Sequence, residues 1–321
     1  MIKTWPEKLQ YAPICICPYS RYDLLKQVIA ALQNNVLASE SALFLFSDAP
    51  YRPDHTDAVQ KVRDYLHTID GFKHVFVIER EKNYGPINNY TNACELLLER
   101  YERIIVLEDD IITSPFFLQY MNDALNCYKD HPKIMAISAY RAPFPAKCKN
   151  DIFFMQNFKS WGNATWKKWH EASIEFEAEE IIEKLKKQSL MKKFNYYSSI
   201  IILNQRLLIQ TAKKVINARD AVLRANILYK DGYVIFPSRS LTNHAGFKDG
   251  QHTSVDINDF ITTLADSPIK VEPLEVVENS KLVKSLHYWT LRVHLKLLIK
   301  YIFTLGPIWN YLKKMGKNKE F

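Results

Sequence analysis

The stretch Arg103–Asp110, RIIVLEDD, places three consecutive carboxylic acids directly after an apolar run rich in β-branched residues. Such a run is typical of a buried strand. Carboxylates at the end of a buried strand need a counter-charge, and a divalent cation is one that several of them can share. The alternative is a solvated acidic turn that caps the helix expected to begin near Ser114. Because the acids follow a strand, we favour the cation site.

Short apolar runs alternate with longer amphipathic runs on both sides of this stretch. The expected strands are Tyr11–Cys17, Ala42–Phe46, His74–Ile78, Arg103–Leu107 and Ile134–Ser138. The expected helices cover 22–33, 54–69, 86–101 and 115–128. This alternation is typical of βαβ units. We therefore predict an α/β fold, with a mostly parallel sheet flanked by helices.

The second half of the chain has a less regular pattern. We expect strands at 152–156 and 233–236, and helices at 174–187 and about 220–230. A Pro-containing stretch around 268–273 separates this body from a basic end. The predicted division is one catalytic-type domain over residues 1–270 and a basic, amphipathic helical tail over 281–321.

The excess positive charge belongs to that tail. The chain has 43 Lys and Arg against 35 Asp and Glu, a net charge of +8. Residues 281–321 hold nine of the cations and only one acid, Glu320, so the other 280 residues are neutral overall. A charge confined to one end argues against a general nucleic-acid surface, and we expect no nucleic-acid partner.

Polar side chains follow several of the predicted strands. Parallel sheets bind ligands beyond the carboxyl ends of their strands, so these side chains are candidate ligand contacts. They are Pro18, Tyr19, Ser20, Arg21, Asp48, Arg80, Asn83, Glu108, Asp109 and Asp110. The sequence has no G-x-G-x-x-G and no G-x-x-x-x-G-K-[ST] motif, which argues against a dinucleotide fold and a P-loop enzyme.

The ordered set of motifs resembles the GT-A glycosyltransferases. Val106–Asp110 is similar to their metal motif, in the Glu-Asp-Asp form of N-acetylglucosaminyltransferase I and related bacterial sugar transferases. Pro13–Arg21 resembles the family's first strand and nucleotide loop, and Phe46–Asp48 its second strand end. The segment from Arg80 to Asn89 resembles the loop and helix before the metal motif, and Ser160–Trp166 the Trp-Gly segment beside the donor sugar. The resemblance covers residues 11–255.

This resemblance implies a GT-A fold and a metal-dependent, inverting transfer of a sugar from a nucleotide-sugar donor. Asp110 would bind Mn²⁺ or Mg²⁺, and Glu108 and Asp109 would contact donor hydroxyls or support the metal through water. The remaining donor contacts that it implies are Pro18, Tyr19, Ser20, Arg21, Asp48, Arg80, Asn83, Gly85, Asn88, Trp161 and Gly162. The family also favours UDP as the nucleotide, and a hexosyl or N-acetylhexosaminyl group as the cargo.

An inverting transferase needs a carboxylate that accepts the proton of the acceptor hydroxyl. The resemblance places an acid of this kind after the Trp-Gly segment, where this chain has Asp220, next to Arg219. The alternative for Asp220 is a cap of the helix expected over 220–230. His244 and His252 fall in a polar, Gly-containing stretch, and we expect His252 to complete the metal site, since imidazole suits Mn²⁺.

The tail has the pattern of an interfacial helix. Lys284, Arg292, Lys296 and Lys300 share one face, and Leu282, Leu286, Val293 and Leu297 lie on the other. We expect it to bind an anionic membrane surface, although packing on the domain or on a second subunit is the alternative.

The first residues have no apolar signal-peptide core, and no uncharged apolar run reaches the ~20 residues of a membrane span. The expected location is therefore cytoplasmic, peripheral on the inner face of a bacterial cell membrane, with a lipid-linked cell-surface glycan precursor as acceptor. Two other functions are open: a nucleotidyltransferase of related fold, and a non-catalytic, membrane-bound scaffold.

Overall fold

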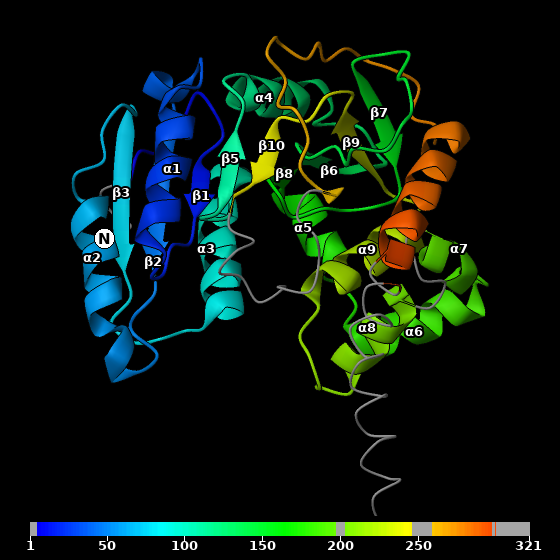
Figure 1. Cartoon of the computed structure of the whole chain (residues 1–321), viewed down its shortest axis with the longest axis horizontal. Coiled ribbons are helices and arrows are strands. Elements are labelled where there is room, and N and C mark those ends of the chain that lie inside the picture. Colours follow the sequence, from blue (N-terminus) through cyan, green and yellow to red (C-terminus); the bar gives the residue numbers. More distant parts are fainter. Residues whose placement is uncertain (1–4, 197–202, 246–258, 297–298, 300–321) are drawn as a thin grey trace, which may run out of the picture.

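The computed structural model describes residues 5–196, 203–245, 259–296 and 299. Its first half alternates strands and helices as predicted (Figure 1). The elements are β1 (Ile14–Ile16), α1 (Tyr22–Gln33), β2 (Ala42–Ser47), α2 (Thr56–Leu66), β3 (His74–Glu79), α3 (Pro86–Tyr101), β4 (Arg103–Val106), β5 (Ile111–Thr113), α4 (Phe117–Cys127) and β6 (Ile134–Ser138). Short 3-10 turns at Ala38–Glu40 and Pro53–His55 precede β2 and α2.

The second half has more short helices than predicted. Its elements are β7 (Ile152–Met155), β8 (Asn163–Trp166), α5 (Lys167–Ser173), α6 (Ala178–Lys187), α7 (Met191–Tyr196), α8 (Leu203–Ala212), α9 (Arg219–Tyr229), β9 (Tyr233–Pro237) and β10 (Thr242–His244). Residues 280–296 form a further helix. The predicted helix 174–187 is wrong in its first turn, because α5 ends at Ser173 and α6 begins only at Ala178.

The strands form an eight-stranded, mostly parallel sheet in the order β3-β2-β1-β4-β8-β6-β9-β7. Strands β7 and β8 run opposite to the other six. A separate pair, β5 and β10, is antiparallel. The predicted α/β class with a mostly parallel sheet is therefore confirmed.

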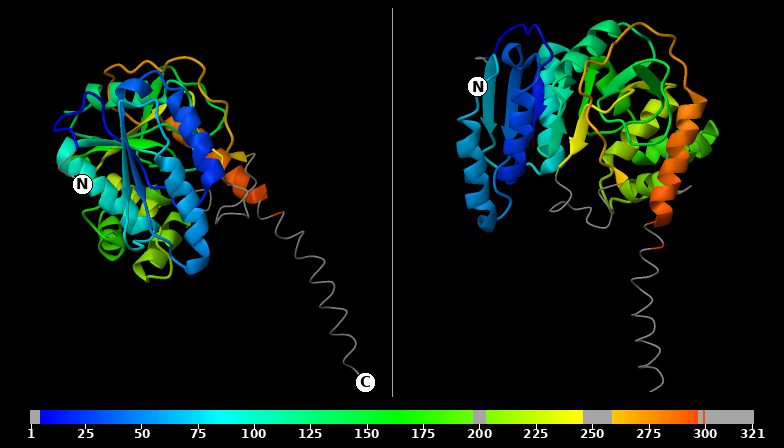
Figure 2. Two further views of the ribbon diagram at one scale, coloured as in Figure 1. Left: turned by 90° about the vertical axis from the view of Figure 1, so that its left-hand side faces the viewer. Right: turned by 45° about the horizontal axis from the view of Figure 1, so that its top comes forward.

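Helices cover both faces of the sheet (Figure 2). On one face, α1, α2 and α4 pack on the alternate residues Ile14, Ile16, Leu43 and Leu45. On the other face, α3 packs on Cys15, Phe44 and Phe46, whose side chains point the opposite way. Both faces are buried, which is why the central strands are continuously apolar rather than alternating.

The helix of residues 280–296 lies against the β7 side of the sheet. Leu282, Val283 and Leu286 are buried with Phe153 and Phe236 in one apolar cluster. The face that the sequence offered to a membrane is thus used for packing on the domain, over the part of the tail that the structure describes. In the described parts of the chain, no helix is both long and apolar enough to cross a bilayer.

Candidate functional site

The sheet topology brings the predicted site residues to one edge. Strands β1, β2, β3 and β4 are parallel, so the residues after them meet at their carboxyl ends. Strand β8 is antiparallel to β4, with Asn163 paired to Val106, so Trp161 and Gly162 enter at the same edge. Helix α9 leads into β9, which is parallel to β6. The helix runs back along the sheet to the start of β9, so it begins at the carboxyl edge, with Asp220 in its first turn.

Arg21 and the acidic triplet form the centre of this edge. The side chains of Asp109 and Asp110 are buried, with 6% and 4% of the residue exposed. Arg21 donates to Asp109 through Nη2 and, more loosely, through Nε, and to Asp110 Oδ2 through Nη1 at 2.6 Å. One guanidinium thus compensates two buried carboxylates that lie 88 and 89 residues away in sequence. Burial nevertheless raises the pKa of Asp109 above its ordinary value, although Arg21 acts against the rise.

Asp110 has one carboxylate oxygen that is paired and one that is not. Its Oδ2 lies 3.4 Å from His244 Nε2, whereas its Oδ1 is buried and has no hydrogen-bond partner within the described residues. Strand pairing fixes His244 here, because it lies opposite Ile111 and the Ala245 amide donates to the Asp110 carbonyl at 2.8 Å.

The described residues contain no group of three or more His, Cys, Asp and Glu arranged to hold a metal alone. Mg²⁺ and Mn²⁺ commonly take only one or two carboxylates, with substrate phosphates and water completing the shell. The orphaned Oδ1 of Asp110 therefore fits an ion that is shared with a phosphorylated ligand.

Glu108 has a different electrostatic environment from its two neighbours. Burial, with repulsion from Asp110 and Asp220, raises the pKa of Glu108 to about 8, and a hydrogen bond from Ser160 only partly opposes this. At neutral pH Glu108 is mostly protonated and can donate a hydrogen bond. The same repulsion places Asp220 of α9 within electrostatic range of Glu108.

Two cationic side chains lie within electrostatic range of Asp220. Burial, with repulsion from Arg224, lowers the pKa of Lys159 to about 8, and attraction to Asp220 opposes the shift. Arg224 lies one turn after Asp220 on α9, and its Nε donates to the Asp220 carbonyl at 3.1 Å. Arg219, the direct neighbour of Asp220, instead pairs with Glu177 at 3.1 Å. Asp220 is therefore more than a surface helix cap: it lies among buried charges.

The Trp-Gly segment closes the edge beside β8. Gly162 has φ +80°, and a Cβ atom there would lie 2.9 Å from Thr242 Cγ2, so the position requires glycine. The Trp161 carbonyl accepts a hydrogen bond from Thr242 Oγ1 at 2.7 Å. The Trp161 ring packs edge-on against Tyr140 and His244, with centroids 4.5 and 5.2 Å apart. This places an aromatic wall next to Asp110.

Asp48 holds the loop that follows β3 in place. Its two carboxylate oxygens accept hydrogen bonds from the amides of Ala49, Tyr84 and Gly85 at 2.8–2.9 Å, and from Asn83 Nδ2 at 3.2 Å. Gly85 has φ +76° and starts α3. The structure therefore gives Asp48, a predicted donor contact, a positioning role in this loop.

The other predicted donor contacts also have partners within the protein. Arg80 donates to Asn89 and Asn92 of α3 and lies over the Tyr84 ring at 4.7 Å. Asn88 is exposed and donates to the Tyr84 carbonyl. The Tyr19 hydroxyl bonds His55 Nδ1 at 2.6 Å and accepts from the Tyr51 amide at 2.8 Å. Pro18 is buried, and Ser20 is half-buried beside Arg21.

The sequence-predicted site thus contains one group of residues that converge. Those that converge are Arg21, Glu108, Asp109, Asp110, Trp161, Gly162 and Asp220. His252 lies outside the described residues. Sequence analysis did not identify Lys159, Ser160 and Arg224 as neighbours of the acids, and it did not link His244 to Asp110. The only available signals were the adjacency of Ser160 to Trp161 and the spacing of four residues from Asp220 to Arg224.

A scan against protein-family models and a search of curated proteins each gave no match to this chain. Among solved structures, the chain is similar to a mannosyltransferase, PcManGT from Pyrobaculum calidifontis, in complex with GDP-Man and Mn²⁺. The identity is 13% and the TM-score 0.45, over 99% of this chain and 85% of that chain. It is also similar to TarS of S. aureus, with 10% identity and a TM-score of 0.42, over 75% of this chain and 37% of that chain. Both TM-scores are below 0.5.

Proposed function

We propose that the chain is a metal-dependent, inverting glycosyltransferase of the GT-A type, which moves a sugar from a nucleotide-sugar to a glycan acceptor. The observation that carries the proposal is the position of Glu108, Asp109 and Asp110 shortly after β4 at the carboxyl edge of the sheet, with Asp220 within electrostatic range of Glu108. Asp109 and Asp110 suit a metal-bound diphosphate, and Asp220 suits proton transfer. The resemblance of the motifs supports the same assignment.

Asp110 would hold Mn²⁺ or Mg²⁺ through its unpartnered Oδ1, with His244 beside its other oxygen. When bound, the cation supplies positive charge that stabilises the departing nucleoside diphosphate. Arg21 orients both carboxylates, and its side chain is 35% exposed, so part of it would be open to the donor phosphates. Asp109 pairs with Arg21 and so helps to hold the guanidinium next to Asp110.

The two remaining acids have separate roles. Glu108, whose pKa is raised by burial, would contact a hydroxyl of the donor. Asp220 is then the carboxylate that accepts the proton of the attacking acceptor hydroxyl. Lys159 and Arg224 hold Asp220 at the site by charge attraction.

The finer features of the proposal come from the resemblance to the GT-A family and from the basic C-terminal segment. We place UDP in the donor, a hexosyl or N-acetylhexosaminyl group as cargo, and a lipid-linked precursor of a bacterial cell-surface polysaccharide as acceptor. The basic C-terminal segment supports an acceptor at an anionic membrane surface, on the cytoplasmic side.

A turnover assay tests this proposal. Purified protein is incubated with a panel of UDP- and GDP-sugars, a bacterial membrane lipid extract and Mn²⁺, and released nucleoside diphosphate is measured. We expect release from one donor, its loss with a chelator, and at least a 1,000-fold decrease in Asp220→Asn with donor binding retained. Asp123→Asn, which changes a carboxylate on α4, is the control and should keep full turnover.

Two results would overturn the assignment. Pyrophosphate release from a nucleoside triphosphate and a sugar phosphate would make the protein a nucleotidyltransferase. Loss of donor binding in Asp220→Asn, together with loss of turnover, would place Asp220 in the nucleotide site instead of at the acceptor.

A further inference from the structure

The outer face of the helix of residues 280–296 has an unusual composition for a protein surface. Ten large apolar side chains are exposed among the described residues, and three of them form one stripe here: Tyr288, Leu291 and Leu295. Their exposed fractions are 67%, 37% and 49%. Spacings of three and four residues place them on the same side of the helix.

This stripe is distinct from the face that packs on the domain. Leu282, Val283, Leu286 and Val293 are buried, and Trp289 is half-buried against them. The helix therefore has two apolar faces, and the fold uses only the inner one. Burying the outer stripe requires something other than the described part of this chain.

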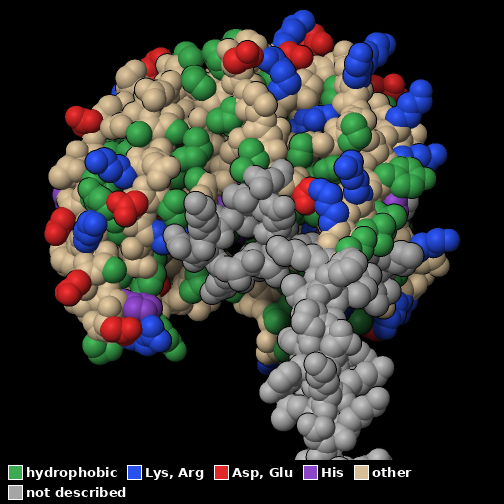
Figure 3. All heavy atoms as spheres, viewed as in Figure 1, with side chains coloured by type: hydrophobic (Ala, Val, Ile, Leu, Met, Phe, Trp, Pro, Cys, Tyr) green, Lys and Arg blue, Asp and Glu red, His purple; other side chains and the backbone are tan. Residues whose placement is uncertain are grey.

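Three cations lie along the exposed stripe: Lys281, Lys284 and Arg292. In the described part of the chain, no carboxylate comes within ion-pair distance of any of them. Lys296, in contrast, pairs with Asp259 at 2.5 Å. Figure 3 shows Lys and Arg side chains beside hydrophobic ones on the right of the molecule, where Figure 1 places this helix.

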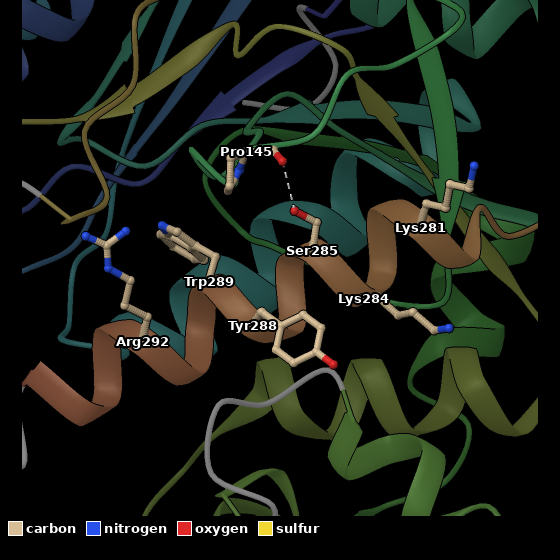
Figure 4. A pocket seen from close by; sticks show the side chains of 7 residues that line it. All are labelled: Pro145, Lys281, Lys284, Ser285, Tyr288, Trp289 and Arg292. Carbon is tan, nitrogen blue, oxygen red and sulfur yellow. Dashed lines mark hydrogen bonds between the residues drawn. The ribbon is translucent and has the colours of Figure 1, made fainter.

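The same cations border a hollow of about 510 Å³. Pro145, Ser285, Tyr288 and Trp289 complete its lining, and Ser285 donates to the Pro145 carbonyl at 3.2 Å. Figure 4 shows Ser285 and Trp289 on the side of the helix that faces Pro145, and Tyr288 on the opposite side. A hollow lined by Tyr288 and Trp289 and bordered by three cations suits the phosphate headgroup of a lipid whose acyl chains meet the apolar stripe.

We propose that this face, made of Lys281, Lys284, Tyr288, Leu291, Arg292 and Leu295, docks the protein on a bilayer that contains anionic lipids. Apolar residues interleaved with unpaired cations match the acyl boundary and the headgroup charge at once. The sequence after the helix adds five Lys against one Glu over residues 300–321, which increases the complementarity to an anionic surface. The inference deepens the membrane part of the proposed function.

Vesicle sedimentation tests the proposal without donor or acceptor, so its result is independent of the sugar-transfer chemistry. The full chain is mixed with sucrose-loaded vesicles of phosphatidylcholine alone, or with a quarter of phosphatidylglycerol, in 0.1 M salt. We expect binding to the anionic vesicles and little to the neutral ones. Lys281→Gln, Lys284→Gln and Arg292→Gln together should weaken that binding about 100-fold, near fivefold for each cation.

A second variant addresses the apolar half of the surface. Leu291→Ser with Leu295→Ser should weaken binding to the same vesicles at least 10-fold, because less apolar area is buried in the interface. The matched controls change exposed residues elsewhere: Lys187→Gln, Lys192→Gln and Lys213→Gln for charge, and Val36→Ser with Val215→Ser for apolar area. All of these should bind as the unmodified protein does.

Three outcomes would overturn the proposal. One is no binding to anionic vesicles, and another is equal binding by the helix variants and their controls. The third is a dimer, measured by light scattering, that Leu291→Ser with Leu295→Ser dissociates, because the stripe would then be a subunit interface. Circular dichroism of each variant confirms that it is folded.

Discussion

Replacing Glu108 by Gln should flatten the pH dependence of stability. The pKa of this carboxyl is raised from 4.5 to about 8 in the folded protein. The folded state thus holds the proton more tightly than the unfolded state does, so the stability contribution is full below pH 4.5 and is lost as the pH rises through 8. A rise of this size is equivalent to about 5 kcal/mol in total, of which about 4 kcal/mol falls between pH 5 and 9.

The measurement is urea denaturation at pH 5, 7 and 9, followed by tryptophan fluorescence. Titrating groups that do not interact with Glu108 are common to both proteins and cancel in the difference. We expect the stability of Glu108→Gln relative to the unmodified protein to increase by about 4 kcal/mol from pH 5 to pH 9. Glu95→Gln, an exposed carboxyl on α3, is the control and should show no such trend.

A difference between Glu108→Gln and the unmodified protein that stays constant from pH 5 to 9 would refute this reasoning. It would mean that Glu108 is ionised throughout, and that the acidic edge is open to water rather than buried.

Three further changes test how the site is held together. Arg21→Ala removes the guanidinium that pairs with the buried carboxylates of Asp109 and Asp110, and it should lower the free energy of unfolding by about 3 kcal/mol. Mn²⁺ should restore part of this loss. Unchanged thermal unfolding in metal-free buffer would contradict the pairing. Gly162→Ala should lower the free energy of unfolding in urea by about 2 kcal/mol, because residue 162 has a left-handed backbone conformation and the added Cβ would collide with Thr242. An unchanged free energy of unfolding would argue against that contact. Asp48→Ala removes the acceptor of several loop amides, so it should lower the free energy of unfolding by about 2 kcal/mol and speed amide hydrogen exchange over residues 83–85. Unaltered exchange would show that the loop does not depend on Asp48.

The strands and helices with long apolar patterns could be predicted from the sequence. Helix 22–33 and strand Ile134–Ser138 match the structure at both ends. Strand β4 ends at Val106, one residue earlier than expected. The strand is buried and the acidic triplet comes shortly after it, as predicted. In each case a single continuous run of side chains decides which face is buried, and this information is local.

The elements around the site depend on distant partners and could not be predicted. Strand β8, Asn163–Trp166, is four residues long and is a strand because β4 and β6 pair with it on either side. The β5 and β10 pair has three residues in each strand, and it is this pairing that brings His244 to Asp110. The link from Arg21 to the acids similarly follows from the parallel pairing of β1 with β4.

The C-terminal helix shows the same limit. Its apolar residues at 282, 286 and 293 were identified correctly as one face, but that face packs on the domain. Tyr288, Leu291 and Leu295 form a second apolar face, and sequence periodicity alone cannot decide which of two such faces the fold buries.

The most direct test of the central claim is calorimetric titration of nucleoside diphosphates and their sugars into the protein, with and without Mn²⁺. The account predicts that one nucleotide binds in the presence of Mn²⁺, and that Asp110→Asn weakens this binding at least 100-fold, whereas Asp123→Asn does not. Tight binding that ignores both Mn²⁺ and the Asp110 change, or no binding of any nucleotide by folded protein, would contradict it.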